Sequence, residues 1–402
     1  MMPRLICLSG FVLVLAASAS SAQQRLLDPR ALSSGVVAEH WSFGDPRPGG
    51  GAASVVNASQ FTVPVTAVVP IVPTWALDTY IAYTHGTVTL DRGGTVGRQQ
   101  LSLSGVNDAK VRLVGKLHGD GVLLTLGASL PSGTTALEPS ALEALSVLSA
   151  PALRFRTPTL GSGPSGTAGL VVAGQNGAWS FAAGGAFEKR GTYAPSEALT
   201  AGLGRPAIRS GDAVHLSLGA DRVLETSRQA ISLIADVYTS GELRDPSSAA
   251  APLVNFRLGP TITGTYQVQA TINDVESMLY IVERYRGNYA VGGTTIDESW
   301  RMESEIGLVN SILLNPQSSL RVALDSRFHT AAFNGAGGQT VAAFATSGIL
   351  AAGATLGFQY SMSGGSFLLE PFVRGQIGQL DLGGPTRRAT GASAGLTLTT
   401  RF

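Results

Sequence analysis

Polar and apolar side chains alternate along much of the chain with a period of two. The clearest run extends from Phe256 to Ala270, where apolar side chains fall mostly on every second position and arginine, threonine and glutamine lie between them. Similar alternation appears over residues 109–117, 300–312, 320–329 and 350–360. Successive side chains of a β-strand point to opposite faces, so this pattern predicts strands with one apolar and one polar face.

So many alternating segments in one chain favour a transmembrane β-barrel over a soluble β-sandwich. In a bilayer every main-chain polar group must be paired internally, and an extended chain achieves this only in a closed barrel. Membrane helices are disfavoured, because the uncharged stretch 48–77 is cut by Pro64, Pro70 and Pro73. The second such stretch, 328–369, never reaches the ~18 consecutive apolar residues of a spanning helix. The predicted fold class is therefore all-β, a transmembrane antiparallel β-barrel.

Turn signals give an estimate of the strand number. Short turns are predicted at residues 175–177, 225–228, 273–274, 315–317 and 363–365, with longer connections between them. Bacterial barrels have short periplasmic turns, longer external loops and an even strand number, so counting from Asp78 predicts about 14 strands, or about 16 if residues 36–43 and 60–69 also join. Residues 23–57 are then expected to be a periplasmic lead-in or a plug, and residues 58–402 the barrel.

Both ends of the chain predict export to the outer membrane of a Gram-negative cell. Arg4, an apolar run and the small residues ending at Ala22 form a signal peptide, residues 1–22. The last segment alternates up to a terminal aromatic residue, which is typical of the signal read by the outer-membrane barrel assembly machinery; its residues are Leu396, Leu398 and Phe402. The expected surroundings are the lipid bilayer and lipopolysaccharide.

Composition excludes several other classes of function. Lys and Arg number 28 and Asp and Glu 27, so removal of Arg4 would leave 27 of each, and no basic surface for nucleic acid is predicted. The single cysteine, Cys7, lies in the signal peptide, so neither disulfides nor thiol chemistry are expected after cleavage. The histidines lack metal-ligand spacing, and no cofactor is expected.

Charged side chains keep to the polar face of the predicted strands. The candidate pore-lining residues are Lys110, Arg112, Arg257, Glu303, Glu305, Arg321, Asp325, Arg327, Glu370 and Arg374. Rings of charge can set solute preference. Alternatively, opposite charges on adjacent strands pair across a narrow lumen and fill it. Both signs occur in similar number, so no strong preference for anions or cations is expected.

Two further features have competing interpretations. His215 and Ser217 share one face of a strand, as in a barrel hydrolase, but the alternation points them to the lumen rather than to lipid, and no enzyme activity is expected. In the longest loop, Ser140 and Glu143 predict a capping box for a short amphipathic helix that Pro151 ends. That helix either enters the external mouth as a lid or packs on its rim.

Three neighbouring stretches carry a family resemblance: residues 104–117, residues 122–133 with their Leu-Pro-Ser-Gly ending, and Thr159-Leu-Gly-Ser-Gly163. Their order resembles the outer-membrane family associated with phenol meta-pathway degradation, relatives of the long-chain fatty-acid transporters. The resemblance implies a barrel that passes small hydrophobic or aromatic solutes. The alternative is a closed surface-structural or adhesion barrel without transport.

Overall fold

The computed structural model describes residues 30–44, 54–93, 95–118, 121–135, 137–150, 152–157, 160–195, 207–244, 254–296, 299–331, 348–381 and 386–401. Among these residues, no helix is long and apolar enough to cross a membrane. The expected signal peptide and the terminal Phe402 lie outside the described residues.

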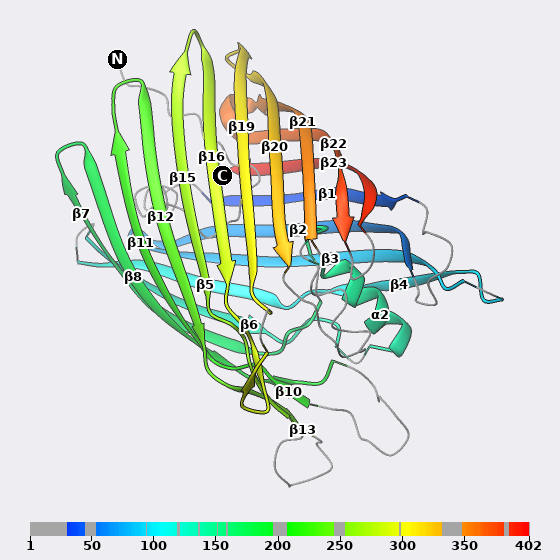
Figure 1. Ribbon diagram of the computed structural model, residues 1–402. Helices are drawn as coiled ribbons and strands as arrows, with labels where there is room; N and C mark the ends of the chain where they lie inside the picture. Colours follow the sequence, from blue (N-terminus) through cyan, green and yellow to red (C-terminus); the bar gives the residue numbers. More distant parts are fainter. Residues whose placement is uncertain are drawn as a thin grey trace.

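A ring of 16 antiparallel strands closes into a barrel (Figure 1). The first part of the ring contains β1 (Ala31–Phe43), β2 (Ser54–Val72), β3 (Trp75–Asp91), β4 (Arg98–Val106), β5 (Ala109–His118), β6 (Val122–Leu130), β7 (Ser165–Asn176) and β8 (Trp179–Arg190). The second part contains β11 (Ala213–Val223), β12 (Ser227–Tyr238), β15 (Thr261–Ile272), β16 (Val275–Arg286), β19 (Arg301–Asn315), β20 (Ser318–Ala331), β21 (Gly348–Met362), β22 (Phe367–Asp381) and β23 (Arg387–Arg401). Both β4 and β5 pair with β3, so they act as one interrupted strand.

The prediction of about 14 strands is wrong, because the chain before Asp78 contributes two more strands to the ring. Strand β1 pairs with β2 and also with β23, from Ala31 opposite Arg401 to Phe43 opposite Ala389. Residues 31–43, which the sequence assigned to the lead-in, are therefore barrel strand. The pattern was obscured because the polarity of β1 is reversed over its second half, where Trp41 is buried inside and His40 is exposed outside.

The two ends of the barrel differ. Short connections follow β2, β5, β7, β11, β15, β19 and β21 and define the turn end, where the last link contains the 3-10 turn η2 (Ser363–Gly365). Longer connections define the loop end. Between the ends, the outer surface is a belt of exposed apolar side chains, which include Val36, Leu170, Leu216, Leu233, Ile262, Ile306, Leu324, Leu356, Val373 and Leu396. The outward face thus has the polarity predicted from the alternation.

A second sheet of six short strands continues the wall at the loop end. Its strands are β9 (Thr192–Tyr193), β10 (Ala207–Arg209), β13 (Gly241–Arg244), β14 (Val254–Arg257), β17 (Ala290–Val291) and β18 (Thr294–Thr295). The predicted strand from Phe256 to Ala270 is therefore two strands. It breaks at Gly259-Pro260, because Gly259 packs directly on the main chain of Gly287, whose N–H bonds the Pro260 carbonyl at 2.8 Å.

The connection between β6 and β7 carries the helix α2 (Pro139–Leu148), which confirms the predicted amphipathic helix. Glu138, and not Ser140, is the N-cap residue, and no side chain caps the helix, so the predicted capping box is wrong. Glu143 instead pairs with Arg92 of the neighbouring wall. The helix packs on β2, β3 and β4 (Figure 1). Its Leu148 lies against Gly86 on the inner face of β3.

Candidate functional site

The connection from residue 131 to residue 164, called here the inserted segment, turns into the barrel instead of standing on its rim. Its apolar side chains join inward-facing residues of β1–β4 and β21–β23 in one buried core, which includes Trp41, Val88, Leu90, Leu101, Val147, Leu148, Leu153, Phe155, Ile349 and Leu380. Burying such side chains is favourable by roughly 1.5–3 kcal/mol each. The hydrophobic effect therefore holds the segment against one side of the lumen.

Hydrogen bonds fix the inserted segment to β1 and β2. The Trp41 indole N–H donates to the Leu153 carbonyl at 3.1 Å. Gln60 and Thr157 bond reciprocally: the Gln60 amide donates to the Thr157 carbonyl at 2.8 Å, and the Thr157 N–H donates to Gln60 Oε1 at 3.0 Å. The Arg156 N–H donates to Glu39 at 3.0 Å. Four neighbouring contacts thus tie residues 153–157 to this wall.

Arg154 extends away from β1 and β2 and joins the inserted segment to β19. Its guanidinium pairs with Glu305 and lies 4.0 Å from Glu303. Burial acts to lower the pKa of Arg154, but the Glu305 and Glu303 carboxylates outweigh it and keep the pKa raised. Because β19 and β1 are separated in the ring by β20–β23, the segment bridges the lumen, and Arg154 remains charged at neutral pH.

The inner faces of β16, β19, β20 and β22 form a wall of paired charges. Glu303 lies 3.1 Å from Arg284 and 2.8 Å from Arg301. Arg374 pairs with Asp325 at 2.6 Å. The Tyr280 hydroxyl donates to Glu305 at 2.9 Å. Buried charges need partners of opposite sign, and each of these has one. For Glu303, Glu305, Asp325 and Arg374 the contacts therefore support the alternative that lumen charges pair with one another across neighbouring strands.

The inner faces of β7, β8 and β11 are different, because they carry mainly small side chains. Residues on this small-residue wall include Thr167, Gly169, Ala173, Ala182, Gly184, Ala186, Ser217 and Gly219. Most of their neighbours on the inner face are half-buried rather than buried. The lumen therefore keeps accessible space on this side, away from the inserted segment.

The other predicted pore-lining residues lie on several different strands. Lys110 and Arg112 face inward from β5, where Arg112 pairs with Asp78 at 2.5 Å. Arg321, Arg327 and Glu370 also face inward, and Arg327 donates to Gln376 at 2.8 Å. Arg257 belongs to β14, outside the barrel ring. Of the predicted assembly signal, Leu396 and Leu398 face outward on β23.

His215 has the environment of a structural ion-pairing residue. Its Nδ1 lies 2.7 Å from Asp236 and its Nε2 3.5 Å from Glu188, while Val214 and Leu216 point outward. Both ring nitrogens thus face carboxylates on the neighbouring strands. The strand orientation predicted for His215 is confirmed.

Asp108 organises the inserted segment, a role that the sequence did not predict. It sits in the break between β4 and β5, is 2% exposed, and accepts hydrogen bonds from the N–H groups of Gly133, Ser162 and Gly163. Its position in the first of the three family-like stretches was the one available signal.

No known protein-family profile matches this sequence, and no curated protein matches it. Among solved structures, a FadL homologue of Pseudomonas aeruginosa is similar at 10% identity, over 93% of this chain and 91% of that chain, with a TM-score of 0.44. Pseudomonas aeruginosa OccK2 is similar at 10% identity, over 93% and 96%, with a TM-score of 0.44. The CymD monoaromatic hydrocarbon channel is similar at 8% identity, over 96% and 91%, with a TM-score of 0.39. Likenesses of this degree assign neither a family nor a solute to this chain.

Proposed function

We propose that this chain is a channel in the outer membrane of a Gram-negative bacterium, through which small solutes pass without a cofactor. A closed ring satisfies the main-chain hydrogen bonds, and the outward apolar belt suits the acyl chains of a bilayer. The turn end then faces the periplasm and the loop end the exterior. The expected signal peptide and terminal alternation support the same location.

The observation that carries the proposal is the asymmetry of the lumen. The inserted segment fills the side next to β1–β4, whereas the small-residue wall of β7, β8 and β11 keeps accessible space. A fully filled barrel would bury its inner side chains on every strand. The proposed path runs along the small-residue wall, past Arg154 and its partners on β19.

The proposed solutes are small and neutral, with hydrophobic or aromatic compounds as the preferred class. The charges near Arg154 are largely paired with one another, which leaves little net field to select an ion. Alanine and valine side chains on the small-residue wall offer apolar contact. The resemblance of residues 104–163 to an aromatic-degradation family supports the same class.

The test compares two adjacent alanines of β8 that point to opposite sides of the wall. Ala182 faces the lumen beside Gly219, and Ala183 faces outward beside Leu218. Single-channel conductance is measured for the refolded protein in planar bilayers. We expect Ala182→Phe to lower conductance by roughly a third to a half, because a benzyl group occupies lumen cross-section. Ala183→Phe should leave it unchanged.

Solute class is measured by swelling of proteoliposomes in a small aromatic alcohol or in a sugar of similar size. Faster entry of the aromatic compound, slowed by Ala182→Phe, supports the proposed class. Equal conductance of both phenylalanine variants would contradict the proposed path. Silence of a folded wild-type barrel would favour the alternative, a closed surface-structural barrel.

A further inference from the structure

The outward face of the barrel changes polarity over the loop-end halves of β1–β4. Below this level the outward residues are apolar and include Leu32, Val36, Phe61 and Ile81, all of them exposed. Above it they become polar: His40, Ser42, Asn57, Ser59, His85, Thr87, Thr89, Gln100, Ser102 and Ser104. The inner side is apolar there and is covered by the inserted segment.

This reversal marks where the bilayer ends on this side of the barrel. Polar side chains on a lipid-facing surface are costly within the acyl region but suited to the headgroup region. Tyr83, 45% exposed, lies at the transition, as aromatic residues do at membrane interfaces. The outer wall above Tyr83 therefore contacts headgroups and not acyl chains.

A groove of about 560 Å³ crosses this boundary on the outside of β22, β23 and β1–β3. Small side chains of Ala38, Ala392 and Ala394 border it between the larger Val373 and Phe61. Glu39 and Gln60 also border it, although their side chains bond the inserted segment inside. The groove is thus a depression in the wall, formed because small residues follow one another across β1 and β23.

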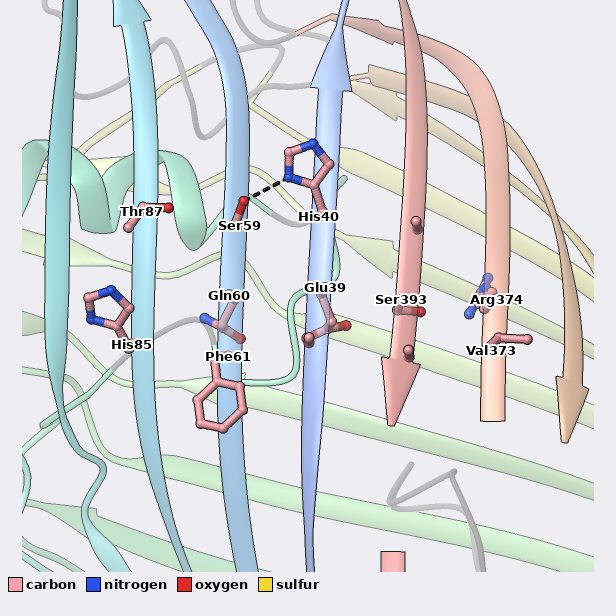
Figure 2. Close-up of a pocket in the computed structure, with 13 residues that line it drawn as sticks. Glu39, His40, Ser59, Gln60, Phe61, His85, Thr87, Val373, Arg374 and Ser393 are labelled. Atoms are coloured by element: carbon pink, nitrogen blue, oxygen red, sulfur yellow. Dashed lines mark hydrogen bonds between the residues drawn. The ribbon is translucent and has the colours of Figure 1, made fainter. Parts of the chain in front are cut away.

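His40, Ser59 and Thr87 edge the groove toward the loop end, and His85 lies opposite Phe61 on β3. Figure 2 shows the side chains of His40, Ser59, Phe61 and His85 on the neighbouring strands β1, β2 and β3. His40 Nδ1 lies 2.7 Å from Ser59 Oγ. Thr87 is the cross-strand neighbour of Ser59. The groove therefore has apolar residues toward the turn end and hydrogen-bonding groups toward the loop end.

We propose that the groove is a binding site for one phosphorylated lipid of the external leaflet. An acyl chain lies along Ala394, Val373 and Phe61, and a phosphate is held by His40 on the loop-end side, while His85, opposite Phe61, borders the groove on β3. This order of apolar and polar groups matches an amphiphile whose headgroup is at the boundary. The exposed Arg388, further along the same face of β23, adds positive charge on the headgroup side. The site rests on the proposed outer-membrane location.

The His40–Ser59 pair is better suited to binding than to ester hydrolysis. A serine nucleophile needs donors that stabilise the developing oxyanion. Ser59 is paired with His40 on one side and Thr87 on the other, so its main chain is part of the sheet ladder. Within the described residues, no carboxylate forms a hydrogen bond with His40 that would orient it as a base.

The test is native mass spectrometry of the purified barrel titrated with bisphosphorylated lipid A and with the same lipid after dephosphorylation. We expect one retained lipid A, bound about tenfold more tightly than the dephosphorylated form, since a charged phosphate accepts stronger hydrogen bonds. The double variant His40→Ala with His85→Ala should remove that preference. Ala394→Leu should prevent retention by filling the groove, and Ala183→Leu, outward on β8, is the matched control.

Equal lipid A retention by Ala394→Leu and Ala183→Leu would overturn the site. Release of fatty acid from the bound lipid, abolished by Ser59→Ala, would also overturn it and favour catalysis. Conductance of the same preparations separates this proposal from the channel. A groove variant that conducts normally without retained lipid supports both proposals, whereas lipid retention by a silent barrel contradicts only the channel.

Discussion

Asp108 Oδ1 accepts a hydrogen bond from the main-chain N–H of Gly133 at 2.8 Å. Its other oxygen accepts from the N–H groups of Ser162, at 2.6 Å, and Gly163, at 3.0 Å. One buried carboxylate thus joins the start and the end of the inserted segment to the break between β4 and β5. The three stretches that carried the family resemblance meet at this point, so their short motifs have a common structural role.

Replacement of Asp108 by alanine should loosen both ends of the inserted segment. It leaves at least three N–H groups without their acceptor, which costs roughly 2–4 kcal/mol of docking free energy. Hydrogen–deuterium exchange of the detergent-solubilised barrel should show faster exchange over residues 131–164, with the barrel strands still protected. Asp78→Ala is the control, because Asp78 pairs with Arg112 across β3 and β5. Unchanged exchange in Asp108→Ala would contradict the anchoring role.

Gly133 is expected to tolerate no side chain at this junction. A Cβ there would lie 2.6 Å from both Asp108 Oδ1 and the Gly161 Cα. Gly133→Ala should therefore reproduce the faster exchange of residues 131–164. Gly166→Ala is the matched control, because a Cβ at Gly166 meets no atom within 4 Å. If both alanine variants exchange like the wild type, the junction is less tightly packed than these distances require.

The barrel wall was predictable where the outer face is apolar and the inner face polar, because there the polarity of a residue gives the direction of its side chain. Leu324 and Asp325 illustrate this: the apolar residue is 55% exposed outside, and the carboxylate pairs with Arg374 inside. Over the loop-end half of β1 the rule reverses, since Trp41 is covered by the inserted segment and His40 is exposed on the outer face. Alternation of polar and apolar side chains with a period of two identifies a strand in both cases, but it does not show which face of the strand is inside the barrel.

The candidate site was less predictable, because it depends on contacts between residues far apart in the chain. Arg154 follows α2 in a loop without periodicity, and its partner Glu305 lies 151 positions away. Nothing local distinguishes a segment that enters the lumen from one that rests on the rim. The apolar inner faces of β1 and β4, which need a cover, would have been the available clue.

Leu148 should be the side chain that keeps α2 docked inside the barrel. It is 1% exposed and lies against Gly86 of β3. Leu148→Ala should weaken docking by about 2–4 kcal/mol, the usual cost of a large-to-small change in a packed core. The measurable result is faster hydrogen exchange of α2. Leu350→Ala, at an outward-facing leucine that is 55% exposed, should leave α2 protected, and equal effects of the two variants would contradict the inward docking.

Arg154 should control the ion preference of the lumen. Arg154→Ala removes one positive charge and releases the segment from β19, while Glu303 keeps Arg284 and Arg301. The reversal potential in a tenfold KCl gradient should shift toward cation preference by roughly 5–15 mV, and conductance should rise, because the bridge across the lumen is broken. Glu305→Gln should shift the potential in the opposite direction. Arg244→Ala, in the outer sheet, is the control. An unchanged reversal potential in both Arg154→Ala and Glu305→Gln would show that neither residue faces the conducting path.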